Sequence, residues 1–306
     1  MSFMRTWLSI VTFALATSCD PAATPRDGTA IDAARDAASI DRRPASDGGT
    51  RDTPASRDGN VVDRAFADST AADRTAHDSA VPDSARPDGA LAPCEAIAGE
   101  VYASLAIQGS PSDRVPAQHA DLNVKLRGWE PTNGTLGLID LAGDTDLPAP
   151  KLYSLFVDDR VPTFVRNYRV YDWDWGCNCR GAVVTDWEAT LTGFAVTPGE
   201  VIECPRSGYD IGGNNAAMVL FVDDDSITLK YTPEDNVVLG YTIHLVGICV
   251  EPSLRARYQA NRAAGTSELP VLRQDQPLGR ARGNELIAAI RDTGSFMDPR
   301  SRKDWW

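Results

Sequence analysis

The sequence predicts a mainly β protein: a disulfide-containing antiparallel β domain that follows a disordered N-terminal tether. Beyond residue 94, short apolar runs rich in β-branched residues alternate with clusters of Gly, Pro, Asn and Asp, the pattern of strands joined by turns. These runs do not alternate with helix-like segments, which argues against a parallel doubly wound sheet. Five of the six cysteines and six of the seven tryptophans also lie from residue 94 onward, so the structured domain is expected there.

Eight segments of this region have the composition of strands. One helix is expected over residues 252–260, where Leu254 and Tyr258 fall on one face. The region is long enough for one domain or for two, residues 94–184 and residues 185–306. The expected strands are residues 100–107, 122–126, 136–141, 163–170, 218–222, 227–231, 241–250 and 286–291.

The charge balance excludes one class of partner. The chain of 306 residues carries 30 basic and 43 acidic side chains, a net charge of −13. Nucleic acids favour proteins with an excess of Lys and Arg, so no nucleic-acid partner is expected. Three histidines in the whole chain leave little room for a His-rich metal site.

The N-terminus has the layout of an export signal, predicted over residues 1–18. Arg5 precedes an apolar run over residues 7–16, which is too short to cross a bilayer as a helix. Residues 16–19 resemble the lipobox of bacterial lipoproteins, with Ala16 where Leu is usual. The resemblance implies a lipid on Cys19, and hence an exported protein anchored to a membrane, periplasmic or on the cell surface. The alternative is an ordinary cleaved signal in which this cysteine is incidental.

Residues 19–93 are expected to form a disordered tether. Asp recurs at about every fifth position among Ala, Ser, Thr, Gly, Pro and Arg, and Phe66 is the only aromatic residue. Such a segment buries too little apolar surface to offset its conformational entropy. As a coil it would span about 50 Å. Calcium binding by the regular aspartates is the alternative, but calcium sites use Gly-turned loops that this segment lacks.

The remaining five cysteines are an odd number, which predicts two disulfides and one unpaired thiol without choosing among the pairings. Cys177 and Cys179 are too close for an ordinary hairpin bridge and are expected to pair with separate partners. A zinc site would need further ligands nearby, and none has the right spacing, so no metal or other cofactor is predicted. The five disulfide candidates are Cys94, Cys177, Cys179, Cys204 and Cys249.

The last third of the chain carries a family resemblance. Residues 272–281 resemble the "kxGqxiGxx" hairpin of lysostaphin/LytM-type zinc peptidases, which cut peptidoglycan crosslinks. Residues 283–299 resemble the closing "HLHFEvRxxGxxvDP" strand and turn of that family. Residues 241–245 resemble its "YxHL" segment with one residue too many. The resemblance covers at best residues 185–300 and implies a LytM-like fold there.

The family's metal ligands are not matched. Glu285 and Ile287 stand where the family has the two histidines of HLH, and Arg206 stands where its H-x-G-x-D element begins. Hydrolytic zinc chemistry needs three protein ligands and an open position for water. The resemblance therefore implies a domain that has lost its metal site and binds or regulates instead of cutting.

Four residues are candidates for catalysis if the protein is an enzyme: His119, Asp121, His244 and Glu285. His119 and Asp121 could work as an acid–base pair, and His244 lies in an alternating strand. Each histidine has a structural alternative, as a loop residue or as a buried, hydrogen-bonded one. Catalysis requires all four in one cleft, because hydrogen bonds reach only about 3 Å.

Residues 171–180 are the densest candidate for ligand binding. Strand alternation puts Trp173 and Trp175 on one face and Asp172 and Asp174 on the other. Two aligned indoles make a platform for a sugar ring, with carboxylates as hydrogen-bond acceptors. The same pattern also fits a strand whose indoles fill the core.

The sequence is compatible with three functions. The first is a lipid-anchored envelope protein whose β domain binds cell wall or glycan without catalysis, with the membrane and peptidoglycan or another glycan as partners. The second is a hydrolase acting on peptidoglycan or polysaccharide. The third is a structural or protein-interaction domain. The C-terminal Trp305 and Trp306 are expected to dock on the domain, because frayed ends rarely carry two indoles.

Overall fold

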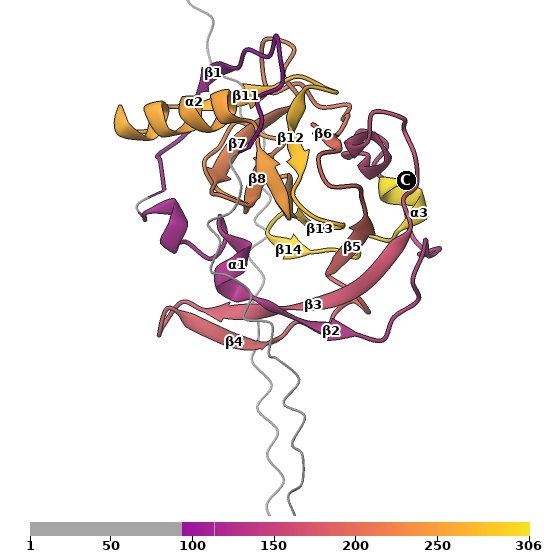
Figure 1. The fold of residues 1–306 in the computed structure, drawn as a ribbon. Helices are drawn as coiled ribbons and strands as arrows, with labels where there is room; N and C mark the ends of the chain where they lie inside the picture. Colours follow the sequence, from indigo (N-terminus) through magenta and orange to yellow (C-terminus); the bar gives the residue numbers. More distant parts are fainter. Residues whose placement is uncertain (1–93, 113) are drawn as a thin grey trace, which may run out of the picture. The chain divides into compact units, whose positions relative to one another are not determined.

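A computed structural model describes residues 94–112 and 114–306, which belong to one compact unit of the chain. The expected signal peptide, Cys19 and the tether lie outside the described residues. Figure 1 shows a fold built mainly from antiparallel strands, which confirms the predicted fold class. Within the described ranges, no helix is long and apolar enough to cross a membrane.

One sheet of eleven strands organises the domain, with a spatial order β1-β11-β7-β8-β9-β13-β5-β3-β2. Strand β14 pairs with β13, and β4 pairs with β3. A small second sheet has the order β10-β12-β6. The strands are β1 (Ala103–Ala106), β2 (Trp129–Thr132), β3 (Phe164–Asp174), β4 (Cys179–Val183), β5 (Leu191–Ala195), β6 (Val201–Glu203), β7 (Ala217–Val222), β8 (Ser226–Lys230), β9 (Tyr241–Val246), β10 (Ile248–Val250), β11 (Glu268–Leu272), β12 (Pro277–Ala281), β13 (Glu285–Asp292) and β14 (Ser295–Phe296).

The large sheet contains strands from both sides of residue 184, the boundary between the two possible domains. Strand β3 belongs to the first part and pairs with β5 of the second, with Phe164 opposite Phe194. Strand β1 likewise pairs with β11. A cut at residue 184 would therefore leave both parts with unpaired strand edges, which are costly to expose.

The central strands separate an apolar face from a polar one. Ile227, Leu229, Ile243 and Leu245 are fully buried in the main hydrophobic core. Because side chains alternate along a strand, the residues between them point to the opposite face. That face carries a row of polar side chains from three neighbouring strands: Thr228, Lys230, Thr242, His244 and Arg291, all buried.

The expected helix over residues 252–260 is confirmed as α2 (Pro252–Ala263). Its start is set by Glu251, whose carboxylate accepts hydrogen bonds from the backbone N–H groups of Ser253 at 2.7 Å and Leu254 at 2.9 Å. Pro252 at the first helical position needs no backbone partner. Leu254 and Tyr258 are the two buried residues of the helix, as expected.

Two expected strands are absent. Residues 122–126 lead into a short helix, α1 (Val124–Arg127), instead, because Asn123 caps it by accepting from Lys125 N at 3.2 Å. Residues 136–141 form only an isolated bridge, between Ile139 and Ser301. The Ile139 N–H donates to the Arg300 carbonyl at 3.0 Å and the Ile139 carbonyl accepts from the Arg302 N–H at 2.9 Å, so this segment pairs with the C-terminal segment and not with the sheet.

Both disulfides and the free thiol are present, but one pairing was predicted wrongly. Cys94 bonds to Cys249, and Cys177 bonds to Cys179. Asn178 lies between the second pair with a φ of 52°, so the chain reverses and brings the two cysteines together. Cys204 is free and buried, and burial raises the pKa of its thiol.

The C-terminus docks on the domain through α3 (Arg302–Trp305), as expected. Trp305 is buried, and its indole N–H donates to the carbonyl of Asp298 at 2.8 Å. Trp306 packs against Phe164 and Phe194, with ring centroids 5.6 Å and 5.3 Å away. Two short 3-10 turns complete the fold, η1 (Pro116–Gln118) and η2 (Leu152–Leu155).

Candidate functional site

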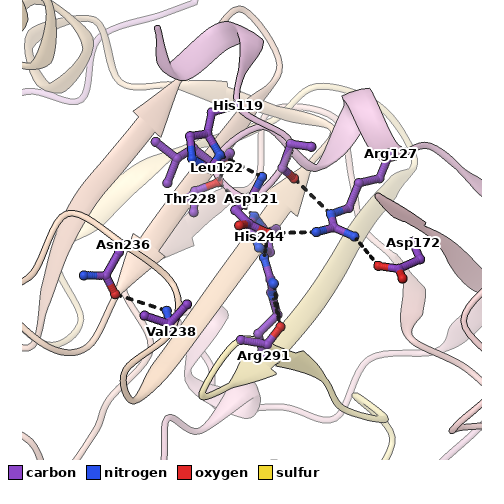
Figure 2. Close-up of polar contacts among 12 residues, drawn as sticks. His119, Asp121, Leu122, Arg127, Asp172, Thr228, Asn236, Val238, His244 and Arg291 are labelled. Carbon is purple, nitrogen blue, oxygen red and sulfur yellow. Dashed lines mark hydrogen bonds and ion pairs between the residues drawn. The ribbon is translucent and has the colours of Figure 1, made fainter. Parts of the chain in front are cut away.

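Asp121 lies at the centre of the polar face, held by two arginines (Figure 2). Its Oδ1 accepts from Arg127 Nη2 at 2.8 Å and from Arg291 Nη1 at 2.9 Å. Its backbone N–H donates to His119 Nδ1 at 3.2 Å, so His119 and Asp121 are adjacent. Burial alone would raise the pKa of Asp121, but the two guanidinium groups outweigh it and hold the pKa below its usual range.

Arg127 connects Asp121 to Asp172 on β3. Its Nη1 donates to Asp172 Oδ1 at 3.2 Å, and its Nε donates to the Ala120 carbonyl at 3.1 Å. The guanidinium carbons of Arg127 and Arg291 lie 5.5 Å and 4.7 Å from the centroid of the Phe296 ring. Two cations stacked on one aromatic ring and bridged by one carboxylate form a rigid, ordered cluster.

His244 lies under this cluster and is fully buried. The Thr228 hydroxyl donates its one hydrogen to the Leu122 carbonyl at 2.6 Å, so it accepts from His244 Nδ1 at 2.9 Å. This leaves Nε2 as an acceptor, and among the described residues it has no hydrogen-bond partner. Burial lowers the pKa of His244 well below its usual value, and Arg291 adds to the effect, so the ring is neutral.

Trp173 and Trp175 lie at the tip of the β3–β4 hairpin and belong to neither hydrophobic cluster of the domain. Their ring centroids are 6.4 Å apart and their ring planes meet at 66°, so the indoles are packed edge to face and are not aligned as expected. Trp175 is 40% exposed. The His119 ring meets Trp175 edge to face at 5.1 Å, and Arg114 lies 4.8 Å from the same indole. The structure thus brings the candidate platform and the candidate acid–base pair into one site.

The hairpin tip is held by several local contacts. The Cys177–Cys179 disulfide closes it, and Asp174 Oδ1 accepts from the Gly176 N–H at 2.8 Å. Asn178 Oδ1 accepts from Arg114 Nη1 at 2.8 Å, which ties the tip to the segment before η1. The indoles are therefore presented by a constrained loop.

Glu285 is not part of this site. It lies four positions along β13 from Ala289, the register partner of His244, which corresponds to about 13 Å. Its Oε1 accepts from the Tyr168 hydroxyl at 2.9 Å instead. Three of the four candidate catalytic residues are brought together, and the fourth is not.

One hollow is lined by Asp121, and a second is lined by its two arginine partners. The first, of about 350 Å³, is lined by His119, Asp121, Leu122 and the loop containing Asp235. The second, of about 210 Å³, is lined by Arg127, Arg291 and Phe296 among others. Sequence reasoning missed Asp235, which is only 2% exposed. In the sequence, Asp235 is a carboxylate in the loop between two hydrophobic strands. Such loop residues are common, so this position alone does not indicate a functional residue.

A larger hollow, of about 640 Å³, lies beside α3. Two of its carboxylates are already committed to protein partners. Asp146 accepts from the hydroxyls of Tyr209 at 2.5 Å and Tyr241 at 3.0 Å. Asp304 accepts from the hydroxyls of Ser301 at 2.5 Å and Thr145 at 2.7 Å. The Thr145–Asp304 contact attaches the C-terminal helix, and the Asp146 contacts join the segment next to Thr145 to Tyr209 and Tyr241, so this hollow has a structural explanation.

Within residues 94–112 and 114–306, no group of three or more His, Cys, Asp or Glu side chains is arranged to hold a metal ion. Neither a family model nor a curated protein nor a solved structure matches the chain in the comparisons. The lipoprotein and LytM resemblances therefore rest on the sequence motifs alone.

Proposed function

We propose that this chain is a lipid-anchored cell-envelope protein whose β domain binds cell-wall glycan without catalysis. The observation that carries the proposal is the pair of indoles, Trp173 and Trp175, at the tip of a disulfide-closed hairpin. Indoles outside the core cost solvation free energy unless a ligand covers them, and sugar rings present apolar faces that stack on them. The His119 ring borders Trp175, with ring centroids 5.1 Å apart.

The rigidity of the tip favours binding. A ligand that orders a flexible loop loses affinity to the entropy of ordering. Here the disulfide, the Asp174–Gly176 hydrogen bond and the Arg114–Asn178 hydrogen bond already hold the loop. The loop is therefore already ordered before a ligand binds, and binding loses little conformational entropy there.

The envelope location rests on two independent features. Residues 16–19 have the lipobox pattern, and a long polar segment follows them before the β domain begins. Two disulfides are typical of proteins that fold in an oxidising compartment outside the cytoplasm. A lipid on Cys19 and a coil of residues 19–93 would hold the domain within reach of the wall.

We propose binding without catalysis because the candidate catalytic side chains are bonded to other residues, buried or far apart. Asp121 is engaged by two arginines, His244 is buried and neutral, and Glu285 lies at the other end of β13. A general base must reach the proton it removes. His244 is only 1% exposed and does not meet that condition.

The test is cosedimentation of the full chain with purified peptidoglycan sacculi. The wild type is expected in the pellet, and Trp175→Ala is expected to weaken binding about tenfold, a loss of about 1.4 kcal/mol. Leu147→Ala is the matched control, because Leu147 is a 78% exposed apolar side chain outside the hairpin. A wild type that stays in the supernatant, or a control that loses as much as Trp175→Ala, would overturn the proposal.

A second candidate, hydrolysis of a glycan, is favoured by one observation. Asp121 and Asp235 line the same hollow, and their environments move their pKa values in opposite directions: arginines lower that of Asp121, and burial raises that of Asp235. Such divergence is typical of acid and base pairs in glycosidases. Release of reducing ends from sacculi by the wild type, abolished in Asp235→Asn, would establish this function in place of simple binding.

A further inference from the structure

The turn between β3 and β4 carries a disulfide whose two cysteines are exposed to solvent. Cys177 and Cys179 are both exposed, and Figure 1 shows this turn at the edge of the fold. The second disulfide is half-buried at both of its cysteines, Cys94 and Cys249, and the free Cys204 is buried. Thiol–disulfide exchange begins when a thiolate attacks a disulfide sulfur, so the sulfur has to be accessible. Of the two disulfides in the described residues, the one at the turn meets this condition better.

Folding protects the two disulfides unequally. A disulfide that stabilises a fold is itself stabilised by that fold to the same extent. The stabilisation grows with the length of the loop that the bond closes, and the sequence separation is 2 for Cys177–Cys179 against 155 for Cys94–Cys249. The native structure therefore resists reduction of Cys94–Cys249 much more than reduction of the exposed bond. Exposed disulfides are typically the labile or catalytic ones.

Contacts other than the disulfide also hold the hairpin. Asp174 Oδ1 accepts from the Gly176 N–H at 2.8 Å, and Asn178 Oδ1 accepts from Arg114 Nη1 at 2.8 Å. Strands β3 and β4 remain paired up to the turn, with Asp174 opposite Cys179. None of these contacts uses a sulfur atom. The hairpin is therefore expected to stay in place on the domain when the disulfide opens.

The arginine at the turn favours a thiolate. The guanidinium of Arg114 bonds to Asn178, the residue between the two cysteines. A thiolate leaves when the disulfide opens, and a nearby cation stabilises it. The opposing charge is the Asp174 carboxylate, which already accepts a backbone N–H. The guanidinium of Arg180 is directed elsewhere, 5.2 Å from the centroid of the Tyr171 ring.

We propose that Cys177–Cys179 is a disulfide donor, which transfers its bond to the two thiols of a substrate dithiol. One substrate thiolate attacks the sulfur of either cysteine, a mixed disulfide forms, the Cys177–Cys179 bond breaks, and the other cysteine leaves as a thiolate that takes up a proton. The second substrate thiolate then attacks the substrate's own sulfur in the mixed disulfide. This step closes the substrate disulfide and displaces the remaining cysteine, which also takes up a proton. The substrate loses two electrons and two protons, and the cysteine pair gains them.

This activity goes beyond glycan binding and does not rest on it. Its test is a single-turnover reaction of the oxidised full chain with a peptide that carries two cysteine thiols. Free thiols of the chain are alkylated beforehand, and the reaction is stopped at intervals with a second, mass-labelled alkylating reagent. Mass spectrometry then measures reduction of each cysteine and oxidation of the peptide. Cys177–Cys179 is expected to open about 100-fold faster than Cys94–Cys249, with one peptide disulfide formed per chain.

Two double variants separate the disulfides. Cys177→Ser with Cys179→Ser is expected to oxidise no peptide in the time of that turnover. Cys94→Ser with Cys249→Ser is the matched control and is expected to oxidise peptide at the wild-type rate. If the control variant does not fold, the comparison of the two bonds within the wild type still decides. Equal opening rates of the two bonds in the wild type, or undiminished peptide oxidation without Cys177 and Cys179, overturn the proposal.

Glutathione at the same thiol concentration tests the choice of a dithiol. A monothiol needs a second encounter to complete the reduction, whereas the second thiol of the peptide is already held next to the mixed disulfide. Complete reduction of Cys177–Cys179 is therefore expected to be about tenfold slower with glutathione. An equal or faster reduction by glutathione overturns the assignment of a dithiol substrate.

Discussion

Arg291 and Asp121 form a buried ion pair, with Nη1 and Oδ1 2.9 Å apart and both side chains largely withdrawn from water. Arg291 comes from the middle of the sheet and Asp121 from the segment that crosses over it. The pair therefore attaches the crossing segment, and with it His119, to the polar face of β13. Breaking a buried pair leaves the surviving charge without compensation, which is strongly destabilising.

This pair predicts a loss of stability in acid. The folded-state pKa of Asp121 lies below its unfolded value, so its contribution is complete above the unfolded pKa and disappears as the pH falls through the folded one. Asp121→Asn is expected to lower the free energy of unfolding by about 3 kcal/mol at pH 7 and to flatten the decline below pH 4. Urea titrations at pH 7 and pH 3 measure both effects. Asp210→Asn serves as control, and an equal loss in that variant would contradict the role of the pair.

The two disulfides are expected to differ in their effects. Cys94–Cys249 closes a loop with a sequence separation of 155, and replacing both cysteines by serine should cost about 5 kcal/mol of stability. Cys177–Cys179 closes a loop with a separation of 2, so the same change should cost less than about 2 kcal/mol but should weaken sacculus binding. Denaturation and cosedimentation of both double variants test this. The reverse order of stabilities would be inconsistent with the loop-closure argument.

Lys230 predicts a stabilising substitution. It is fully buried, its Nζ has no hydrogen-bond partner among the described residues, and burial lowers its pKa to about 8. Because the folded pKa is below the unfolded one, the ammonium is unfavourable below about pH 8, and stability should rise between pH 8 and the unfolded pKa of 10.5. Lys230→Met should add on the order of 1 kcal/mol at pH 7 and remove this rise.

Lys125→Met is the matched control for that experiment. Lys125 pairs with Asp223 at 2.6 Å and also with Asp225, which together raise its pKa against the opposing effect of burial. Its replacement should lower stability slightly, by less than about 1 kcal/mol. A gain in both variants, or a loss in Lys230→Met, would show that the unpaired ammonium is not the cause.

Replacement by alanine should affect stability at Trp305 and glycan binding at Trp175. Trp305 is buried against Tyr241, with ring centroids 5.7 Å apart, so Trp305→Ala should cost about 3–5 kcal/mol of stability. Trp175→Ala at the exposed tip should change stability by less than about 0.5 kcal/mol while weakening glycan binding. Thermal denaturation of the two variants side by side is sufficient. Similar losses of stability would place Trp175 in a structural role.

The fold class was predictable because its signal is local. Alternation in residues 227–231 and 241–246 marks strands with one apolar face, and Pro252 after Glu251 marks the start of a helix. The short apolar runs at 122–126 and 136–141 carry the same local signal. Their outcome depends on the Asn123 cap in the first run and, in the second, on backbone hydrogen bonds between Ile139 and the distant C-terminal segment.

The site was predictable only in part, because it is assembled by contacts between distant segments. His119, Asp121 and Trp175 could be named from residue type, yet their proximity depends on where the β3–β4 hairpin lies relative to η1. Asp235 carries no local pattern, and only its burial without a complete hydrogen-bond set identifies it. The Cys177–Cys179 bond depends on the left-handed backbone of Asn178, which residue spacing does not reveal.

The most direct test of the central claim is cosedimentation of the wild-type full chain with purified sacculi over a range of protein concentrations. Saturable binding that Trp175→Ala weakens about tenfold and Leu147→Ala leaves unchanged is the predicted result. A wild-type chain that remains in the supernatant at every concentration would contradict glycan binding.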